Sequence, residues 1–140
     1  MNRVVFDTNV VVSSVLKREG AEAYVLDLAA AHQIQLYVTQ EILEEYDEVL
    51  HRAKFKHLEP GMISGVLDLI RRASNLVKPG KTLSLSPDEN DNRFFECADT
   101  AHAHYIVTGN KKHFPVGLED TEIVNARELI EIITNQILDE

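Results

Sequence analysis

The stretch from Arg3 to Asn9 constrains the fold more than any other part of the chain. Three apolar residues that favour strands, Val4 to Phe6, lead directly into Asp7, and a run of valines follows Asn9. This order predicts a buried strand that ends at Asp7 and a helix that begins just after it. Ligands of open parallel sheets bind just beyond the carboxyl ends of the strands, so Asp7 stands where a site would form. Helix capping is the alternative role for its carboxylate.

The rest of the chain alternates strand and helix patterns. This alternation predicts an α/β domain of three α/β/α layers around a central parallel sheet, spanning residues 1–140. Thr39 and Asn125 are expected to cap helices, and Pro60 suits a first helical turn. Further strands are expected at 35–38, 75–78, 105–108 and 122–124, and helices at 21–32, about 40–53, from 60, from 90 or 91 to about 104, and from 126.

Composition limits the function classes. A chain of 140 residues that is 44% hydrophobic can form one compact core. It carries neither a run of about 20 apolar residues nor a basic-then-apolar signal pattern at its start, so a cytoplasmic location is expected. The lone Cys97 is interpreted as a small core residue rather than a nucleophile.

The net charge of −9 argues against a broad surface that neutralises nucleic-acid phosphates. It is compatible with a small acidic crevice, because carboxylates that gather in one place repel each other unless a cation joins them. Short basic runs, among them Lys111-Lys112-His113, fall in or beside predicted loops, where they could meet a phosphate or simply face solvent.

Two more polar positions are expected at the same sheet edge as Asp7. The strand at 105–108 delivers Gly109 and Asn110, and the helix that feeds this strand starts near Asp91. Such a helix runs antiparallel to its strand, so its first turn lies near the strand's carboxyl end. We therefore expect Asp91 and Asn110 to share an edge with Asp7.

Helical geometry sorts the acids of residues 40–53. At 100° per residue, Glu44 and Glu48 point away from the apolar stripe and are solvent charges. Glu45 and Asp47 flank the stripe on opposite sides. Geometry alone leaves open which of these two reaches a crevice.

Four motifs, in this order, make nearly the whole chain resemble the PIN-domain nucleases, in particular the toxin components of bacterial and archaeal toxin-antitoxin pairs. In that family, acidic residues hold Mg²⁺ or Mn²⁺ for RNA cleavage. The resemblance implies that Asp7, Glu45 and Asp91 are the metal-binding acids, and it selects Glu45 over Asp47. The motifs are Val-Val-Phe-Asp-Thr-Asn-Val from residue 4, Glu-Ile-Leu-Glu-Glu-Tyr-Asp-Glu-Val-Leu from 41, Asp-Glu-Asn-Asp-Asn-Arg-Phe from 88 and Tyr-Ile-Val-Thr-Gly-Asn-Lys-Lys-His-Phe-Pro from 105.

One position departs from the family pattern. A fourth acid often follows the Thr-Gly turn, and this chain has Asn110 there. An amide oxygen can ligate a hard cation or a metal-bound water without adding negative charge, so a second ion should bind more weakly. Asp99 could compensate, but it lies about 12 Å further along the helix than Asp91 and is interpreted as a helix-face acid.

The remaining candidates are supporting residues. Asn9 and Thr108 are expected to orient the metal ligands, and Lys111 to contact substrate. For His113 two interpretations stay open: a positive loop that grips the RNA backbone, or part of a packed His-Phe-Pro turn.

These observations predict a divalent-metal-dependent endoribonuclease that hydrolyses RNA phosphodiesters with metal-activated water. The resemblance further implies a homodimer and a small antitoxin partner. One alternative is a phosphatase of the haloacid dehalogenase type, although Asn9 stands where that chemistry needs a second Asp. The other is a non-catalytic binding module that keeps the PIN-like fold.

Overall fold

The first predicted strand lies at the centre of the sheet. The structure is a computed structural model and describes residues 1–139, which form one five-stranded sheet in the order β3-β2-β1-β4-β5. All neighbouring strands run parallel. The central strand β1 (Arg3–Phe6) lies between β2 (Gln35–Val38) and β4 (Tyr105–Val107), and the edges are β3 (Asn75–Leu76) and β5 (Glu122–Val124).

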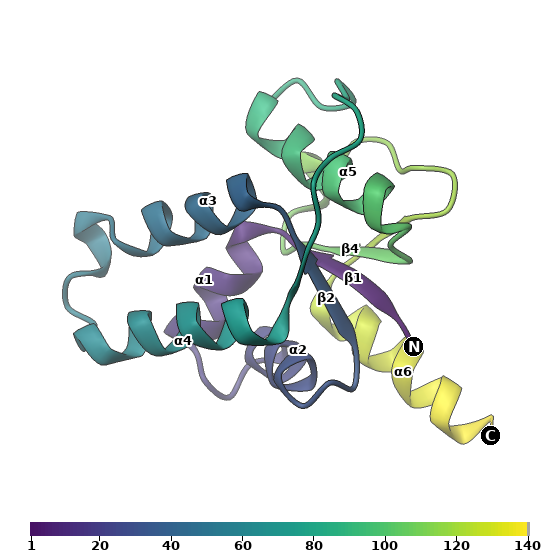
Figure 1. The fold of residues 1–140 in the computed structure, drawn as a ribbon. Coiled ribbons are helices and arrows are strands. Elements are labelled where there is room, and N and C mark those ends of the chain that lie inside the picture. Colours follow the sequence, from purple (N-terminus) through teal and green to yellow (C-terminus); the bar gives the residue numbers. More distant parts are fainter. Residues whose placement is uncertain (140) are drawn as a thin grey trace.

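Helices cover both faces of this sheet (Figure 1). On one face α5 (Glu89–Ala101) packs against β1, β2 and β4, whereas α2 (Ala21–Ala30) and α6 (Ala126–Leu138) lie on the other. The predicted α/β/α layering is thereby confirmed. The remaining helices are α1 (Thr8–Leu16), which packs on α2, and α3 (Gln40–Leu50) and α4 (Pro60–Ala73), which pair in an arm beside the sheet.

Two predicted caps hold as expected. Thr39 Oγ1 accepts a hydrogen bond from the backbone N–H of Ile42 at 3.2 Å, at the start of α3. Asn125 and Glu128 form a reciprocal capping box at the start of α6, with N–O distances of 2.8 and 2.9 Å. These local signals therefore fix the two helix starts.

Other boundaries differ from the prediction for local reasons. The carboxylate of Asp88 accepts from the N–H of Asn90 at 3.0 Å, so α5 begins at Glu89, earlier than expected. The same helix ends at Ala101, because His102 adopts the left-handed conformation with φ of 51°. The edge strand β3 has only two residues, and α3 ends at Leu50 before a short 3₁₀ turn at Ala53–Phe55.

The core is continuous between the sheet and both helix layers. Cys97 is fully buried in it, and burial raises the pKa of its thiol to about 12, which agrees with the interpretation as a core residue. The hydroxyl of buried Tyr46 donates to the carbonyl of Phe6, joining α3 to the last residue of β1. Within residues 1–139 no helix combines the length and the apolar character that a membrane span requires.

Candidate metal centre

Asp7 stands at the carboxyl end of the central strand. It occupies the N-cap position of α1, yet its side chain makes no capping hydrogen bond. Its Oδ2 instead accepts from the hydroxyl of Thr108 at 2.7 Å and lies 3.2 Å from Nδ1 of His113. The side chain is only 5% exposed. The carboxylate is thus directed to the end of β4, the side on which the sequence predicts an acidic crevice, and capping, the alternative from the sequence, is not its role.

Asp91 approaches the same point from α5. It lies in the first turn of that helix, where the backbone N–H groups favour negative charge, and it is buried. Its Oδ2 lies 3.5 Å from the hydroxyl of Ser86. Burial raises the pKa of Asp91, the His113 ring opposes this rise, and the nearby charges of Asp88 and Asp7 add to it.

Three side chains converge here as a set that could hold a divalent ion. Asp7, Asp91 and His113 each offer one ligand atom, and these atoms lie within 4.8 Å of one another. Among residues 1–139 no group donates a hydrogen bond to Oδ1 of Asp7 or to Oδ1 of Asp91. Each carboxylate therefore keeps one oxygen whose lone pairs are available to a cation.

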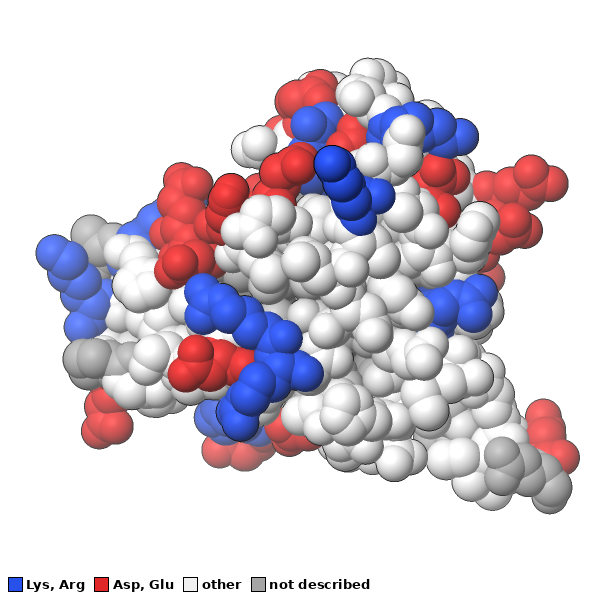
Figure 2. Space-filling view, in the orientation of Figure 1, with Lys and Arg blue, Asp and Glu red and all other residues white. Residues whose placement is uncertain are grey.

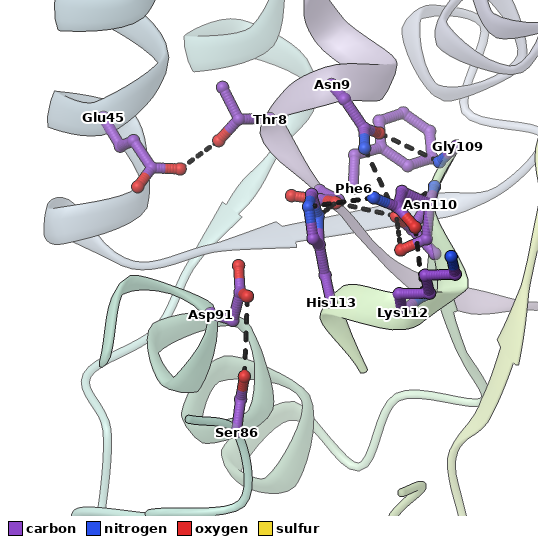
Figure 3. Close-up of polar contacts among 12 residues, drawn as sticks. Phe6, Thr8, Asn9, Glu45, Ser86, Asp91, Gly109, Asn110, Lys112 and His113 are labelled. Atoms are coloured by element: carbon purple, nitrogen blue, oxygen red, sulfur yellow. Dashed lines mark hydrogen bonds and ion pairs between the residues drawn. The ribbon is translucent and has the colours of Figure 1, made fainter. Parts of the chain in front are cut away.

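Glu45 lies at the rim of this set. Its carboxylate accepts from the hydroxyl of Thr8, the residue after Asp7, which brings α3 to the start of α1 (Figure 3). Burial raises the pKa of Glu45 and the hydrogen bond from Thr8 opposes this rise, while the negative charges of Asp7 and Asp91 raise it further. Glu45 is therefore electrostatically part of the crevice, although it is outside the group of converging ligand atoms.

The other acids of α3 face elsewhere. Glu44 and Glu48 are exposed, as their helical phase predicts. Asp47 is paired with His51 at 2.8 Å and with Arg71 of α4 at 3.8 Å, away from the crevice. Helical phase alone did not distinguish Glu45 from Asp47. In the structure, Glu45 lies on the side of Asp7 and Asp47 does not.

The side chain of Asn110 is bonded within the turn that follows it, not to Asp7 or Asp91. Its Oδ1 accepts from the backbone N–H of Lys112 at 3.1 Å, and its Nδ2 lies 3.2 Å from Nε2 of His113. The amide caps the 3₁₀ turn Lys111–His113 and orients the imidazole. The neighbouring ring, rather than the Asn110 amide, lies beside Asp7.

Two residues hold the two strand ends together. Asn9 Oδ1 accepts from the N–H of Gly109 at 2.9 Å, which links α1 to the turn after β4. Thr108, fully buried, accepts from the N–H of Asn110 at 3.0 Å while it donates to Asp7. Thr108 holds Asp7 directly, whereas Asn9 fastens the turn after β4; that both orient metal ligands stays a prediction.

Two further candidates are engaged in ion pairs. The ammonium of Lys111 lies 2.7 Å from Glu128 on α6, and this hydrogen bond lowers the pKa of that carboxyl. Asp99 is 3.7 Å from Lys81 and does not join the converging set. Lys111 and Asp99 thus have structural partners outside the crevice.

The sequence did not single out the residues that position Asp91. Asn92, which is 1% exposed, accepts from the backbone N–H groups of Leu85 and Ser86 at 2.9 and 2.8 Å. It also donates to the carbonyl of Ser86 at 3.1 Å, so one side chain fastens the preceding loop to α5. A buried Asn leaves no trace in hydrophobic periodicity, although the apolar Phe94 and Phe95 beside it indicate that this helix face is covered.

Comparison with known proteins supports the same fold. The chain is 30% identical over 118 residues to an uncharacterised protein of Methanocaldococcus jannaschii, covering 78% of this chain and 71% of that protein. It is similar in structure, with a TM-score of 0.56 and 16% identity, to a chain in the crystal structure of VapBC2 from Rickettsia felis bound to a DNA fragment from their promoter. This match covers 86% of the present chain and 98% of the other. The sequence model for the PIN domain matches residues 3–112, and the chain therefore belongs to the PIN domain family.

Proposed function

We propose that this protein is a divalent-metal-dependent endoribonuclease and the toxin of a toxin-antitoxin pair, acting in the cytoplasm as one domain of residues 1–140. The observation that carries the proposal is the convergence of Asp7, Asp91 and His113 within 4.8 Å at the carboxyl end of the sheet. Membership of the PIN domain family and the earlier resemblance to nuclease toxins support the same conclusion.

The donor set fits Mg²⁺ or Mn²⁺. Two buried carboxylates with unused oxygens provide hard ligands, and a cation would relieve the repulsion between Asp7, Asp91 and Glu45. Asp7 and Asp91 would bind the ion, with Glu45 acting on the ion or its waters from the rim. When bound, such an ion lowers the pKa of a water and stabilises charge on the phosphate.

The chain's own residues prepare the site for this chemistry. Thr108 and Asn9 hold Asp7 and the turn after β4 in place, and Thr8 keeps the carboxylate of Glu45 at the crevice. Burial and the charges of Asp7 and Asp91 raise the pKa of Glu45, and a cation bound beside these acids would act in the opposite direction. Lys112 is exposed beside the site and could contact the RNA backbone.

Two protein partners belong to the proposal. The resemblance to toxin components and the similarity to a chain of VapBC2 support an antitoxin, and the same resemblance supports a homodimer. Figure 2 displays a broad uncharged area over α2 and α6. A groove of about 600 Å³ opens there, and Tyr24 and Ile137 on its lining are 53% and 62% exposed. We assign the homodimer contact to this groove, because it exposes apolar side chains of α2 and α6.

The test of the nuclease is cleavage of mixed structured and unstructured RNAs with and without Mn²⁺, comparing the wild type with Asp7→Asn. The Asn side chain still accepts from Thr108 and preserves the shape of the site, so the variant should fold normally. Cleavage should require Mn²⁺ and fall at least about 100-fold in the variant, as expected for loss of a metal-binding charge. Full activity in Asp7→Asn rejects the proposal.

Two matched variants on α3 test the role of Glu45. Glu45→Gln should reduce cleavage, whereas Asp47→Asn, two residues away and paired with Arg71, should leave cleavage unchanged. Equal losses in both variants would point to a disturbed helix rather than to a role of Glu45 in the site.

The two alternatives make different predictions. A non-catalytic binding module gives no saturable Mn²⁺ heat in calorimetry and no change in that heat for Asp7→Asn. A haloacid dehalogenase type phosphatase releases phosphate from an aryl phosphate without cutting RNA. Its acid would have to be at position 9, where Asn9 accepts from the Gly109 backbone and cannot supply a proton in that way.

A further inference from the structure

The turn that follows β4 fixes an imidazole against the acidic crevice. Phe114 is buried and its ring meets Phe94 and Phe95 edge-on, with centroid distances of 6.2 and 5.2 Å. The preceding residue, His113, is thereby held with Nδ1 at 3.2 Å from Asp7, and its side chain is 40% exposed. The turn is packed, and Nδ1 of the ring faces the carboxylate of Asp7 although part of the ring is exposed.

The imidazole of His113 lies next to Asn110, the position at which this chain lacks the acid of the family pattern. Asn110, at the position where the family pattern often has a carboxylate, is exposed and directs its amide to Lys112 and His113. The third ligand atom that converges with Asp7 and Asp91 is a nitrogen of His113. The imidazole therefore completes the donor set on the side from which an acid is missing.

The hydrogen bonds of the ring are compatible with ligation. Since Asn110 accepts from Lys112 N–H through Oδ1, its Nδ2–H group points to Nε2, and the proton of a neutral His113 is on Nδ1. Ligation through Nδ1 would place the ring proton on Nε2, the arrangement typical of histidine ligands. The exposed Asn110 amide, whose Nδ2 lies 3.2 Å from Nε2, would then have to turn its oxygen to this N–H and give up the bond from Lys112 N–H.

We propose that His113 is a direct ligand of the bound ion and that it makes this centre prefer Mn²⁺ to Mg²⁺. The proposal rests on the proposed function, because it concerns the same ion. Mg²⁺ binds oxygen ligands and retains its waters, whereas imidazole nitrogen is a better donor to first-row transition ions. A site with two carboxylates and one imidazole thus discriminates in a way that an all-carboxylate site does not.

Pulsed EPR of bound Mn²⁺ tests the ligand directly in the wild-type protein. Protein grown with ¹⁵N-histidine and unlabelled protein should differ in the nitrogen coupling to the Mn²⁺ electron spin, as expected for a nitrogen bound to the ion. The coupling should disappear in His113→Gln and persist in His57→Gln, a matched change at an exposed loop histidine. Bound Mn²⁺ without histidine coupling in the wild type overturns the proposal.

Affinity measurements test the preference. By calorimetry the wild type should bind Mn²⁺ at least about ten times more tightly than Mg²⁺, and His113→Gln should lose about ten-fold in Mn²⁺ affinity with less than about a two-fold change for Mg²⁺. Equal losses for both ions overturn the selectivity. Absence of any binding that depends on Asp7 contradicts the proposed function itself, whereas binding that depends on Asp7 but not on His113 contradicts only this inference.

Discussion

Thr108 and Asp7, 101 residues apart in the chain, are joined by a hydrogen bond of 2.7 Å between adjacent strand ends. The hydroxyl also accepts from the backbone N–H of Asn110 at 3.0 Å, so its proton is directed to the carboxylate. One buried threonine thus sets both the orientation of Asp7 and the start of the turn that carries His113.

Replacing Thr108 by Val should therefore weaken the site more than the fold. The substitution keeps the branched shape but leaves the Asn110 N–H without its partner and leaves Asp7 Oδ2 with His113 alone, at a cost of about 1–2 kcal/mol in unfolding free energy. Mn²⁺ affinity should fall about ten-fold, as is typical when a group that orients a metal ligand is removed. Denaturant unfolding and calorimetry measure the two effects.

The control is Thr108→Ser, which keeps the hydroxyl. It should restore most of the Mn²⁺ affinity although it removes a buried methyl group. If Thr108→Val binds Mn²⁺ as tightly as the wild type, the hydrogen bond does not position Asp7 for the ion.

Asn92→Ala should be strongly destabilising. The loss leaves the N–H groups of Leu85 and Ser86 and the carbonyl of Ser86 without their bonds to this buried amide. We expect a decrease of about 3 kcal/mol in the unfolding free energy, together with faster amide hydrogen exchange at Leu85 and Ser86. The exposed neighbour Asn90→Ala should change stability by less than about 0.5 kcal/mol. Similar stability of the two variants would contradict this role of Asn92.

His104 should make stability depend on pH. Its Nδ1 accepts from the backbone N–H of Arg3 at 2.9 Å, which requires an unprotonated Nδ1, and burial together with the charge of Arg3 lowers the pKa of His104. The unfolded chain therefore takes up a proton first as the pH falls below about 6.5, so this contribution is present above that pH and is lost on acidification.

The variant His104→Asn isolates this effect, because its amide oxygen accepts from Arg3 without titrating near neutrality. The melting temperature of the wild type should fall more than that of His104→Asn between pH 7.5 and 5.5. Parallel losses would show that other groups account for the whole pH dependence.

Local patterns were sufficient for the fold but only partly for the site. Alternating strands and helices, with Thr39 and Asn125 as caps, predict the parallel sheet and its layers, because each signal involves neighbours in sequence. The edge position of Asp7 and Asp91 follows from topology. The direction of the His113 ring does not, because it depends on how Phe114 packs against α5. Likewise, the pairing of Lys111 with Glu128 needs the position of α6 relative to the turn after β4.

The converging ligands span about three quarters of the 140-residue chain, since Asp7 and His113 are separated by 106 positions. A ribosome that has released only the first hundred residues has made a polypeptide that contains Asp7 and Asp91 but not the strand end that fastens them. The proposed nuclease site can therefore form only after His113 has been synthesised, and the proposed antitoxin would be needed only from that stage onward.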